Sequence, residues 1–163
     1  MKIIGIMGPG ADKATEVDLE TAAYIGEMAA TLGCAVLTGG MKGVMEAAAK
    51  GAKAAGGLTV GLGPTSDRAD MNEHMDIRLV TGMGGGRNYM NILSSDVVVF
   101  VSVGSPGTLS ELAYAIQLQK PSIVIQASQN LIAYINELEA PVVTFVDAPE
   151  AVKPLLQAHL ENS

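Results

Sequence analysis

The sequence predicts a Rossmann-like α/β fold, with a mostly parallel sheet of about seven strands between two helical layers (a three-layer αβα arrangement). Short β-branched segments alternate with alanine-rich or amphipathic segments along the whole chain. Such alternation indicates parallel strands joined by right-handed helical crossovers. The strand segments are continuous apolar runs, which is typical of strands buried on both faces. No linker or low-complexity tract interrupts residues 1–163, so we expect a single domain.

The first half of the chain contains four of the predicted strands. Short apolar runs identify the strands, and Gly33 and Gly56 end the two helices between them, as glycine commonly does. The expected elements are a strand at residues 2–7, a helix ending near 32, a strand at 34–37, a helix at 41–55, a strand at 58–62, a polar loop at 64–73 and a weak strand at 77–80.

The second half begins with a glycine run at residues 84–86, after which Arg87 opens a short helix. The segment 97–103 is the most strongly apolar in the chain, so we expect it to be a central strand. The remaining elements are expected to be a helix at 108–119, a strand at 122–126, a helix at 129–138, a strand at 141–146 and a terminal helix at 150–160.

Composition and charge exclude several classes of function. The net charge of −7 disfavours a nucleic-acid partner, because proteins that bind nucleic acids usually carry a basic patch. No apolar run reaches the ~18 residues of a membrane span, so we expect no membrane partner and a cytoplasmic location. His74 and His159 have no metal-ligand spacing, and the single Cys34 cannot form an internal disulfide. We therefore expect no metal site and no required cofactor.

Three glycine-containing turns follow predicted strands, and in parallel sheets ligands bind at the carboxyl ends of the strands. Glycine lets a backbone adopt positive φ or approach a phosphate closely, but any parallel-sheet protein also needs glycines at such turns. The chain lacks both G-x-G-x-x-G after its first strand and G-K-[ST] after a glycine loop, which disfavours the usual dinucleotide site and a P-loop. The candidate anion-binding residues in these turns are Gly8, Gly39, Gly40, Gly43, Gly104, Ser105, Gly107 and Thr108.

Arg87 is a further candidate for ligand binding. A cation is disfavoured at the N-terminus of a helix, where the helix dipole is positive. A bound anion would remove this conflict, so we favour a ligand contact over a solvated side chain. The next residue, Asn88, either caps the same helix or contacts the ligand.

Thr108 and Glu111 allow two interpretations. Their T-x-x-E spacing matches a capping box, which alone would account for both residues. Alternatively, Glu111 faces the ligand, where it would bind ribose-type hydroxyl groups or stabilise a developing positive charge. The spacing does not separate these interpretations.

Several motifs occur in an order and at spacings that resemble the superfamily of Lonely Guy proteins and molybdenum-cofactor carriers. This resemblance extends from the first strand to about residue 121 and implies a Rossmann-like fold. It also implies a homodimer or homotetramer with the site near the subunit interface. The motifs are TGGMKGVMEAAAKGA (38–52), GGLTVGLGP (56–64), TGMGGGRN (81–88), SD (95–96) and GSPGTLSEL (104–112).

Within that superfamily, the RN pair and the GVME helix start look more like the carrier branch. The other branch, the phosphoribohydrolases, usually has R-K and P-G-G-x-G-T-x-x-E. Arg87 and Glu111 match the arginine and glutamate of that branch, whereas Asn88, Val103 and Ser105 replace its lysine, proline and glycine. The resemblance implies anion binding and makes hydrolysis the less favoured alternative.

Two hypotheses follow. In the first, the chain binds a phosphorylated nucleotide-like or pterin-type ligand, such as the molybdenum cofactor, without turnover. In the second, the same site cleaves the N-glycosidic bond of a nucleoside 5′-monophosphate. Arg87 would then hold the phosphate, and Glu111 would stabilise an oxocarbenium-like ribose and orient water, which would make both residues catalytic.

Overall fold

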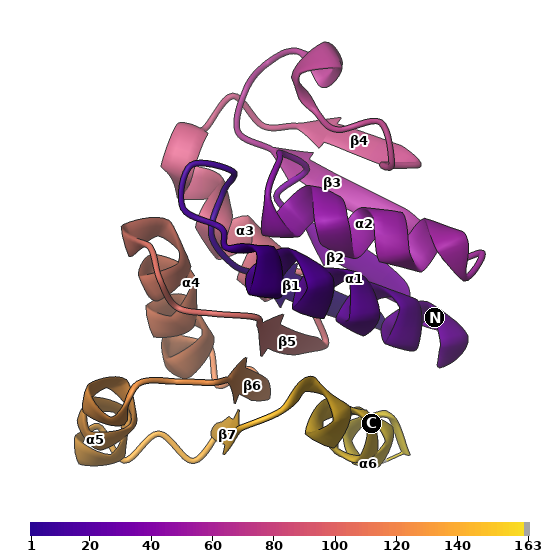
Figure 1. Cartoon of the computed structure of the whole chain (residues 1–163). Helices are drawn as coiled ribbons and strands as arrows, with labels where there is room; N and C mark the ends of the chain where they lie inside the picture. Colours follow the sequence, from indigo (N-terminus) through magenta and orange to yellow (C-terminus); the bar gives the residue numbers. More distant parts are fainter. Residues whose placement is uncertain (162–163) are drawn as a thin grey trace.

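The computed structural model describes residues 1–161, which form a seven-stranded parallel sheet covered by helices on both faces (Figure 1). The strands are β1 (Ile3–Met7), β2 (Ala35–Thr38), β3 (Thr59–Gly63), β4 (Ile77–Val80), β5 (Val97–Phe100), β6 (Ser122–Ile125) and β7 (Val143–Val146). The α-helices are α1 (Glu16–Thr31), α2 (Val44–Ala54), α3 (Arg87–Leu93), α4 (Pro106–Gln117), α5 (Gln129–Glu137) and α6 (Val152–Glu161). Three short 3₁₀-helices are η1 (Arg68–Asp70), η2 (Gly84–Gly86) and η3 (Pro149–Ala151).

The strand order is β4-β3-β2-β1-β5-β6-β7, and every neighbouring pair is parallel. From β1 the chain adds strands in one direction as far as β4. It then returns to the other side of β1 and continues through β5 to β7. The order therefore reverses between β1 and β5, and the crevice at such a reversal is where ligands bind in open parallel sheets.

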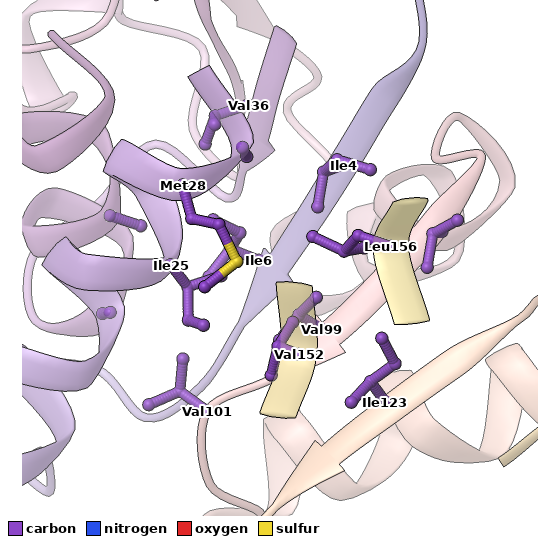
Figure 2. Close-up of a cluster of buried hydrophobic side chains, with 14 of the residues drawn as sticks. Ile4, Ile6, Ile25, Met28, Val36, Val99, Val101, Ile123, Val152 and Leu156 are labelled. Atoms are coloured by element: carbon purple, nitrogen blue, oxygen red, sulfur yellow. The ribbon is translucent and has the colours of Figure 1, made fainter. Parts of the chain in front are cut away.

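Two apolar cores fix the helical layers on the sheet. On one face, side chains of α1, α2 and α6 pack against alternate residues of the central strands. Figure 2 shows Ile25 of α1 and Leu156 of α6 in one apolar cluster with Ile4, Ile6 and Val99 of the sheet. On the other face, α3, α4 and α5 contribute Ile92, Leu112 and Ile135. The predicted three-layer arrangement is therefore confirmed.

The helices α1 and α2 approach each other more closely than ordinary side chains would allow. A Cβ on Gly26 of α1 would overlap the carbonyl oxygen of Ala48, and one on Gly51 of α2 would overlap that of Ala23. The small residues along α1 therefore serve contact with α2 as well as with the sheet. This contact brings the start of α2 close to the turn that follows β1: Val44 N donates to Pro9 O at 3.1 Å.

Most predicted elements occur within a few residues of their expected bounds, with two informative differences. The strand predicted at 97–103 ends at Phe100, so residues 101–105 form the connection to α4. The helix predicted to begin at 108 begins at Pro106, because Ser105 caps it. The Gly104–Thr108 motif therefore contains the end of this connection and the first turn of α4. The segment 97–100 lies near the sheet centre, as expected, since it pairs with β1 and β6.

Candidate functional site

A cavity of about 140 Å³ lies at the carboxyl ends of β1, β2 and β5, at the reversal of strand order. Turns after these three strands and the starts of α3 and α4 form its walls. The fold thus brings together segments that are up to about a hundred residues apart in sequence. The lining residues are Met7, Gly8, Gly10, Gly39, Met45, Arg87, Asn88, Ser105, Gly107, Thr108 and Glu111.

The N-terminus of α4 forms one wall of the cavity. Ser105 is the N-cap residue, and its Oγ accepts a hydrogen bond from the backbone N–H of Thr108 at 3.2 Å. The side-chain hydroxyl oxygens of Ser105 and Thr108 also lie 2.9 Å apart. Pro106 occupies the first turn, where its missing N–H costs nothing. The cap uses the N–H of Thr108 and Pro106 has none, so Gly107 supplies the remaining N–H of the first turn. A free N–H at a helix start favours an anion, and Gly107 lines the cavity together with Ser105 and Thr108.

This arrangement overturns the capping-box interpretation of Thr108 and Glu111. The cap is Ser105, and Thr108 lies three positions inside it, as the donor to that cap. Glu111 is buried, with 5 % of its surface exposed, and lies against α3 rather than at the start of α4. Helix capping therefore does not explain why Glu111 is buried at the cavity.

The guanidinium of Arg87 forms the opposite wall. Only 9 % of the residue is exposed, and its Nη1 donates to Asn88 Oδ1. Its Nη2 lies 4.0 Å from the thioether sulfur of Met45. Its Nε is buried and has no hydrogen-bond partner among the described residues. Burial lowers the pKa of Arg87 from its ordinary value, and the nearby Glu111 opposes that shift. A buried cation with an unused donor has unmet capacity for an acceptor.

Gly39, in the turn after β2, leaves the space that this guanidinium occupies. A Cβ at Gly39 would overlap Arg87 Nη2 and would lie 2.6 Å from its Cζ and 2.8 Å from Met45 Sδ. Any larger residue at this position would therefore displace the guanidinium of Arg87. The sequence alone explains this glycine by close approach of a ligand. The structure adds a second reason, which is the space taken by the Arg87 side chain.

Glu111 lies beside Arg87 on the cavity wall. Its Oε1 accepts a hydrogen bond from Asn91 Nδ2 at 3.1 Å and lies 3.7 Å from Arg87 Nη1. Burial raises the pKa of Glu111 to about 7, although the bond from Asn91 and the charge of Arg87 both lower it. Desolvation therefore outweighs the ion pair, and Glu111 exchanges its proton near neutral pH.

Asn88 joins α3 to α4 instead of capping α3. Its Nδ2 donates to Ser110 Oγ at 3.0 Å and to Gly107 O at 3.3 Å, while its Oδ1 accepts from Arg87. The N-cap position of α3 is Gly86, and no side chain caps it. Asn88 therefore fixes the position of the Arg87 guanidinium relative to the start of α4.

Three predicted site residues do not line the cavity. Gly40 has a φ of +74° and packs against Met71, and Gly43 has a φ of +77° and packs against the turn after β1. These positive φ angles explain both glycines by turn conformation. Gly104 lies on a separate hollow beside α5.

Several residues of the candidate site were not predicted. Met7, Gly10 and Met45 line the cavity, and Asn91 of α3 donates a hydrogen bond to Glu111. Asn91 lies four residues after Arg87, so helical spacing places both on one face, and this signal was present in the sequence. Met45 could not be found in this way, because its position depends on the contact between α2 and Arg87.

Other kinds of site have no counterpart in the part of the chain that the structure describes. Residues 1–161 contain no group of three or more His, Cys, Asp or Glu side chains placed to hold a metal ion. No helix within them is long and apolar enough to cross a bilayer.

The fold and site define a Rossmann-like α/β protein with a cavity at the reversal of strand order, lined by a helix N-terminus and a buried arginine. Residues 1–153 match the SLOG cluster4 family, and the chain belongs to that family. An uncharacterized protein of Archaeoglobus fulgidus is 40 % identical over 133 residues, which cover 77 % of this chain and 86 % of the relative.

Two solved structures are similar over nearly the whole chain. A molybdenum cofactor binding protein from the phototrophic bacterium Rippkaea orientalis is 41 % identical, with a TM-score of 0.91 over 98 % of this chain and 97 % of that one. The molybdenum cofactor carrier protein of Chlamydomonas reinhardtii is 36 % identical, with a TM-score of 0.91 over 99 % of both chains. These similarities agree with the carrier-like features of the RN and GVME motifs.

Proposed function

We propose that this chain binds a phosphorylated pterin-type small molecule, the molybdenum cofactor, and holds it without turnover. The observation that carries the proposal is the buried guanidinium of Arg87, whose Nε has no acceptor within the described residues, beside the N–H of Gly107 in the first turn of α4. A phosphate in the cavity would supply acceptors to both and offset the cost of burying the cation. Similarity to a molybdenum cofactor binding protein and a carrier protein supports the choice of ligand.

The cavity suits one phosphate group. Its volume is about 140 Å³, and Arg87 is the cation among its lining residues. A single guanidinium and one helix N-terminus match a phosphomonoester better than a pyrophosphate. In this proposal the contacts come from Gly8, Gly39, Arg87, Asn88, Ser105, Gly107, Thr108 and Glu111, whereas Gly40, Gly43 and Gly104 act through the shape of their turns.

Binding and recovery of the ligand test this function. The purified protein would be titrated with molybdenum cofactor under anaerobic conditions, and the bound fraction would be released and analysed by mass spectrometry. We expect saturable binding and recovery of unchanged cofactor. Recovery of a cleaved product would contradict a carrier role, and absence of binding would contradict the assigned ligand.

A phosphoribohydrolase is the second candidate, and Glu111 is the observation that favours it. A buried carboxyl group with a pKa raised to about 7, 3.7 Å from a phosphate-binding arginine, has the properties of an acid–base residue. Incubation with AMP and with an adenine-type cytokinin monophosphate separates the two functions. Release of free base that disappears in Glu111→Ala would establish the hydrolase.

We also propose that the chain forms a homodimer or homotetramer, as the resemblance implies. Met83, Tyr89, Met90 and Leu93 leave apolar surface exposed on α3 and just before it, with exposed fractions from 37 % to 54 %. Several large apolar side chains on one short helix are typical of an interface. Analytical ultracentrifugation of the wild type and Leu93→Asp tests this: a sedimenting monomer in both would contradict it.

We propose the cytoplasm as the location of this binding role. Burial raises the pKa of the Cys34 thiol, which leaves it protonated and unreactive. A lone buried thiol is compatible with a reducing compartment. Fractionation of cells that produce the full chain tests the assignment, and recovery in a membrane or exported fraction would contradict it.

A further inference from the structure

A second, larger hollow lies beside the anion cavity, at the carboxyl ends of β5 and β6. Its volume is about 520 Å³, and segments from the β5–α4 turn, the β6–α5 turn and α5 form it. The segment 104–109 separates the two spaces: Ser105 and Thr108 line the anion cavity, whereas Gly104 and Leu109 line the hollow. A ligand bound in the cavity would therefore have only the segment 104–109 between it and the hollow.

Three polar side chains of the hollow have no hydrogen-bond partner within residues 1–161. They are the hydroxyl group of Ser102 and the amide groups of Gln126 and Asn130, which all line the hollow. Together they offer several donors and acceptors, and no charged side chain lies among the lining residues. This combination suits an uncharged ligand with hydrogen-bonding edges.

Apolar side chains form the rest of the hollow. Leu109 is 48 % exposed and Tyr134 is 56 % exposed, which are large fractions for residues of this size. An apolar lining with a few converging polar groups, in a volume of several hundred Å³, is typical of small-molecule sites.

Gly104 stands on the rim of the hollow, and nothing within the described protein requires a glycine there. Its φ lies outside the left-handed region, and a Cβ would meet only Ser102 Oγ, at 3.9 Å. This differs from Gly39, Gly40 and Gly43, for which packing or φ accounts for the glycine. The missing side chain leaves the turn between the two spaces uncovered.

We propose that the hollow is a subsite for the uncharged nitrogen heterocycle, a pterin or purine ring system, of the ligand whose phosphate occupies the anion cavity. This inference rests on the proposed function and specifies where the ring lies. Tyr134 and Leu109 contact the faces of the ring, as aromatic and apolar side chains do with nucleobases. Gln126 and Asn130 bind its edge, since side-chain amides pair with the adjacent donor and acceptor of such rings. The ligand crosses from one space to the other over Gly104.

The test compares ring-bearing and ring-free phosphomonoesters in each variant by isothermal titration calorimetry. The probes are ribose 5-phosphate, guanosine 5′-monophosphate and a pterin phosphomonoester. In the wild type we expect a ring-bearing ligand to bind at least about tenfold more tightly than ribose 5-phosphate. The double variant Gln126→Ala/Asn130→Ala should reduce this ratio by roughly tenfold, because each lost hydrogen bond is worth about threefold to tenfold. Gly104→Val should reduce it by obstructing the rim.

The matched control is Gln129→Ala, which removes an exposed amide of α5 that does not line the hollow and should leave the ratio unchanged. Thermal unfolding checks that each variant folds. If only the pterin phosphomonoester binds more tightly than ribose 5-phosphate, the hollow recognises a pterin ring. If both ring-bearing ligands bind more tightly, it recognises the hydrogen-bonding edge that purines and pterins share. The subsite is overturned if the wild type binds ring-bearing ligands no more tightly than ribose 5-phosphate. It is also overturned if none of the hollow variants changes the ratio of these two affinities. If ribose 5-phosphate binding still depends on Arg87 in that case, the anion site stands; if it does not, the proposed function fails instead.

Discussion

The carboxylate of Glu111 lies 3.7 Å from Nη1 of Arg87, and both side chains are at least nine-tenths buried at one cavity. An anion bound to Arg87 would therefore approach a carboxyl group that titrates near neutral pH. When Glu111 is protonated, the cavity carries the charge of Arg87 and accepts an anion. When Glu111 is ionised, the two charges compensate, and anion binding is opposed.

Replacement of Glu111 by glutamine is expected to strengthen phosphate binding above neutral pH. The amide has the shape of the protonated acid and retains an acceptor for Asn91, but carries no charge. We expect affinity for a phosphomonoester at pH 8 to rise by about tenfold, as removal of one like charge several Å away would produce. Calorimetric titrations of both proteins at pH 6 and pH 8 measure it. Equal affinities at pH 8 would show that Glu111 does not face the bound anion.

The same residue makes folding stability depend on pH. Because the folded-state pKa of Glu111 is raised from 4.5 to about 7, the folded protein binds the proton more tightly than the unfolded chain does. The stabilising contribution is complete below about pH 4.5 and is lost as pH rises through 7. At 1.36 kcal/mol per pKa unit the loss is on the order of 3 kcal/mol.

Urea unfolding of the wild type and Glu111→Gln at pH 5 and pH 8 isolates this contribution. We expect the free energy of unfolding of the wild type to fall more between these values than that of the variant. Other acidic groups are common to both proteins and cancel in the comparison. A parallel pH dependence in the two proteins would show that Glu111 stays ionised when buried.

Gly39→Ala is expected to weaken anion binding by displacing the guanidinium of Arg87, which occupies the position of the new Cβ. The matched control is Gly85→Ala, since a Cβ on Gly85 meets no atom within 4 Å and its φ is ordinary. Phosphomonoester affinity should fall at least about tenfold in the first variant, the scale of a lost charged hydrogen bond, and stay constant in the second.

A double variant establishes that this effect passes through Arg87. In an Arg87→Ala background the added methyl group has no guanidinium to displace, so Gly39→Ala should cause little further loss of affinity. Additive losses would mean that Gly39 contacts the ligand independently of Arg87.

Ser105→Ala is expected to destabilise the fold by about 1 kcal/mol, because the N-cap of α4 loses its acceptor for Thr108 N–H. Ser105→Thr keeps a hydroxyl group at this position and should cost only a fraction of that amount. Urea unfolding measures both. If Ser105→Ala has no effect on stability, α4 does not depend on this cap.

The sequence predicted the architecture well, since continuous apolar strands, glycine stops and repeated strand–helix alternation are local signals. It also predicted a ligand contact for Arg87, because a cation at a helix start is a local electrostatic conflict, and the structure places Arg87 at the cavity. The role of Glu111 could not be resolved in the same way. Its spacing from Thr108 fits a capping box, and only the position of Ser105 in space shows that the cap lies elsewhere. Contacts between distant segments, such as that of Met45 with Arg87, leave no pattern in a single sequence.

The most direct test of the central claim is calorimetric titration of Arg87→Ala with a phosphomonoester ligand, alongside the wild type. If the buried guanidinium provides the anion site, the variant should bind about 1.5–3 kcal/mol more weakly, which is about tenfold to a hundredfold in dissociation constant. An unchanged dissociation constant, in a variant whose thermal unfolding shows an intact fold, would contradict the claim that Arg87 binds the ligand.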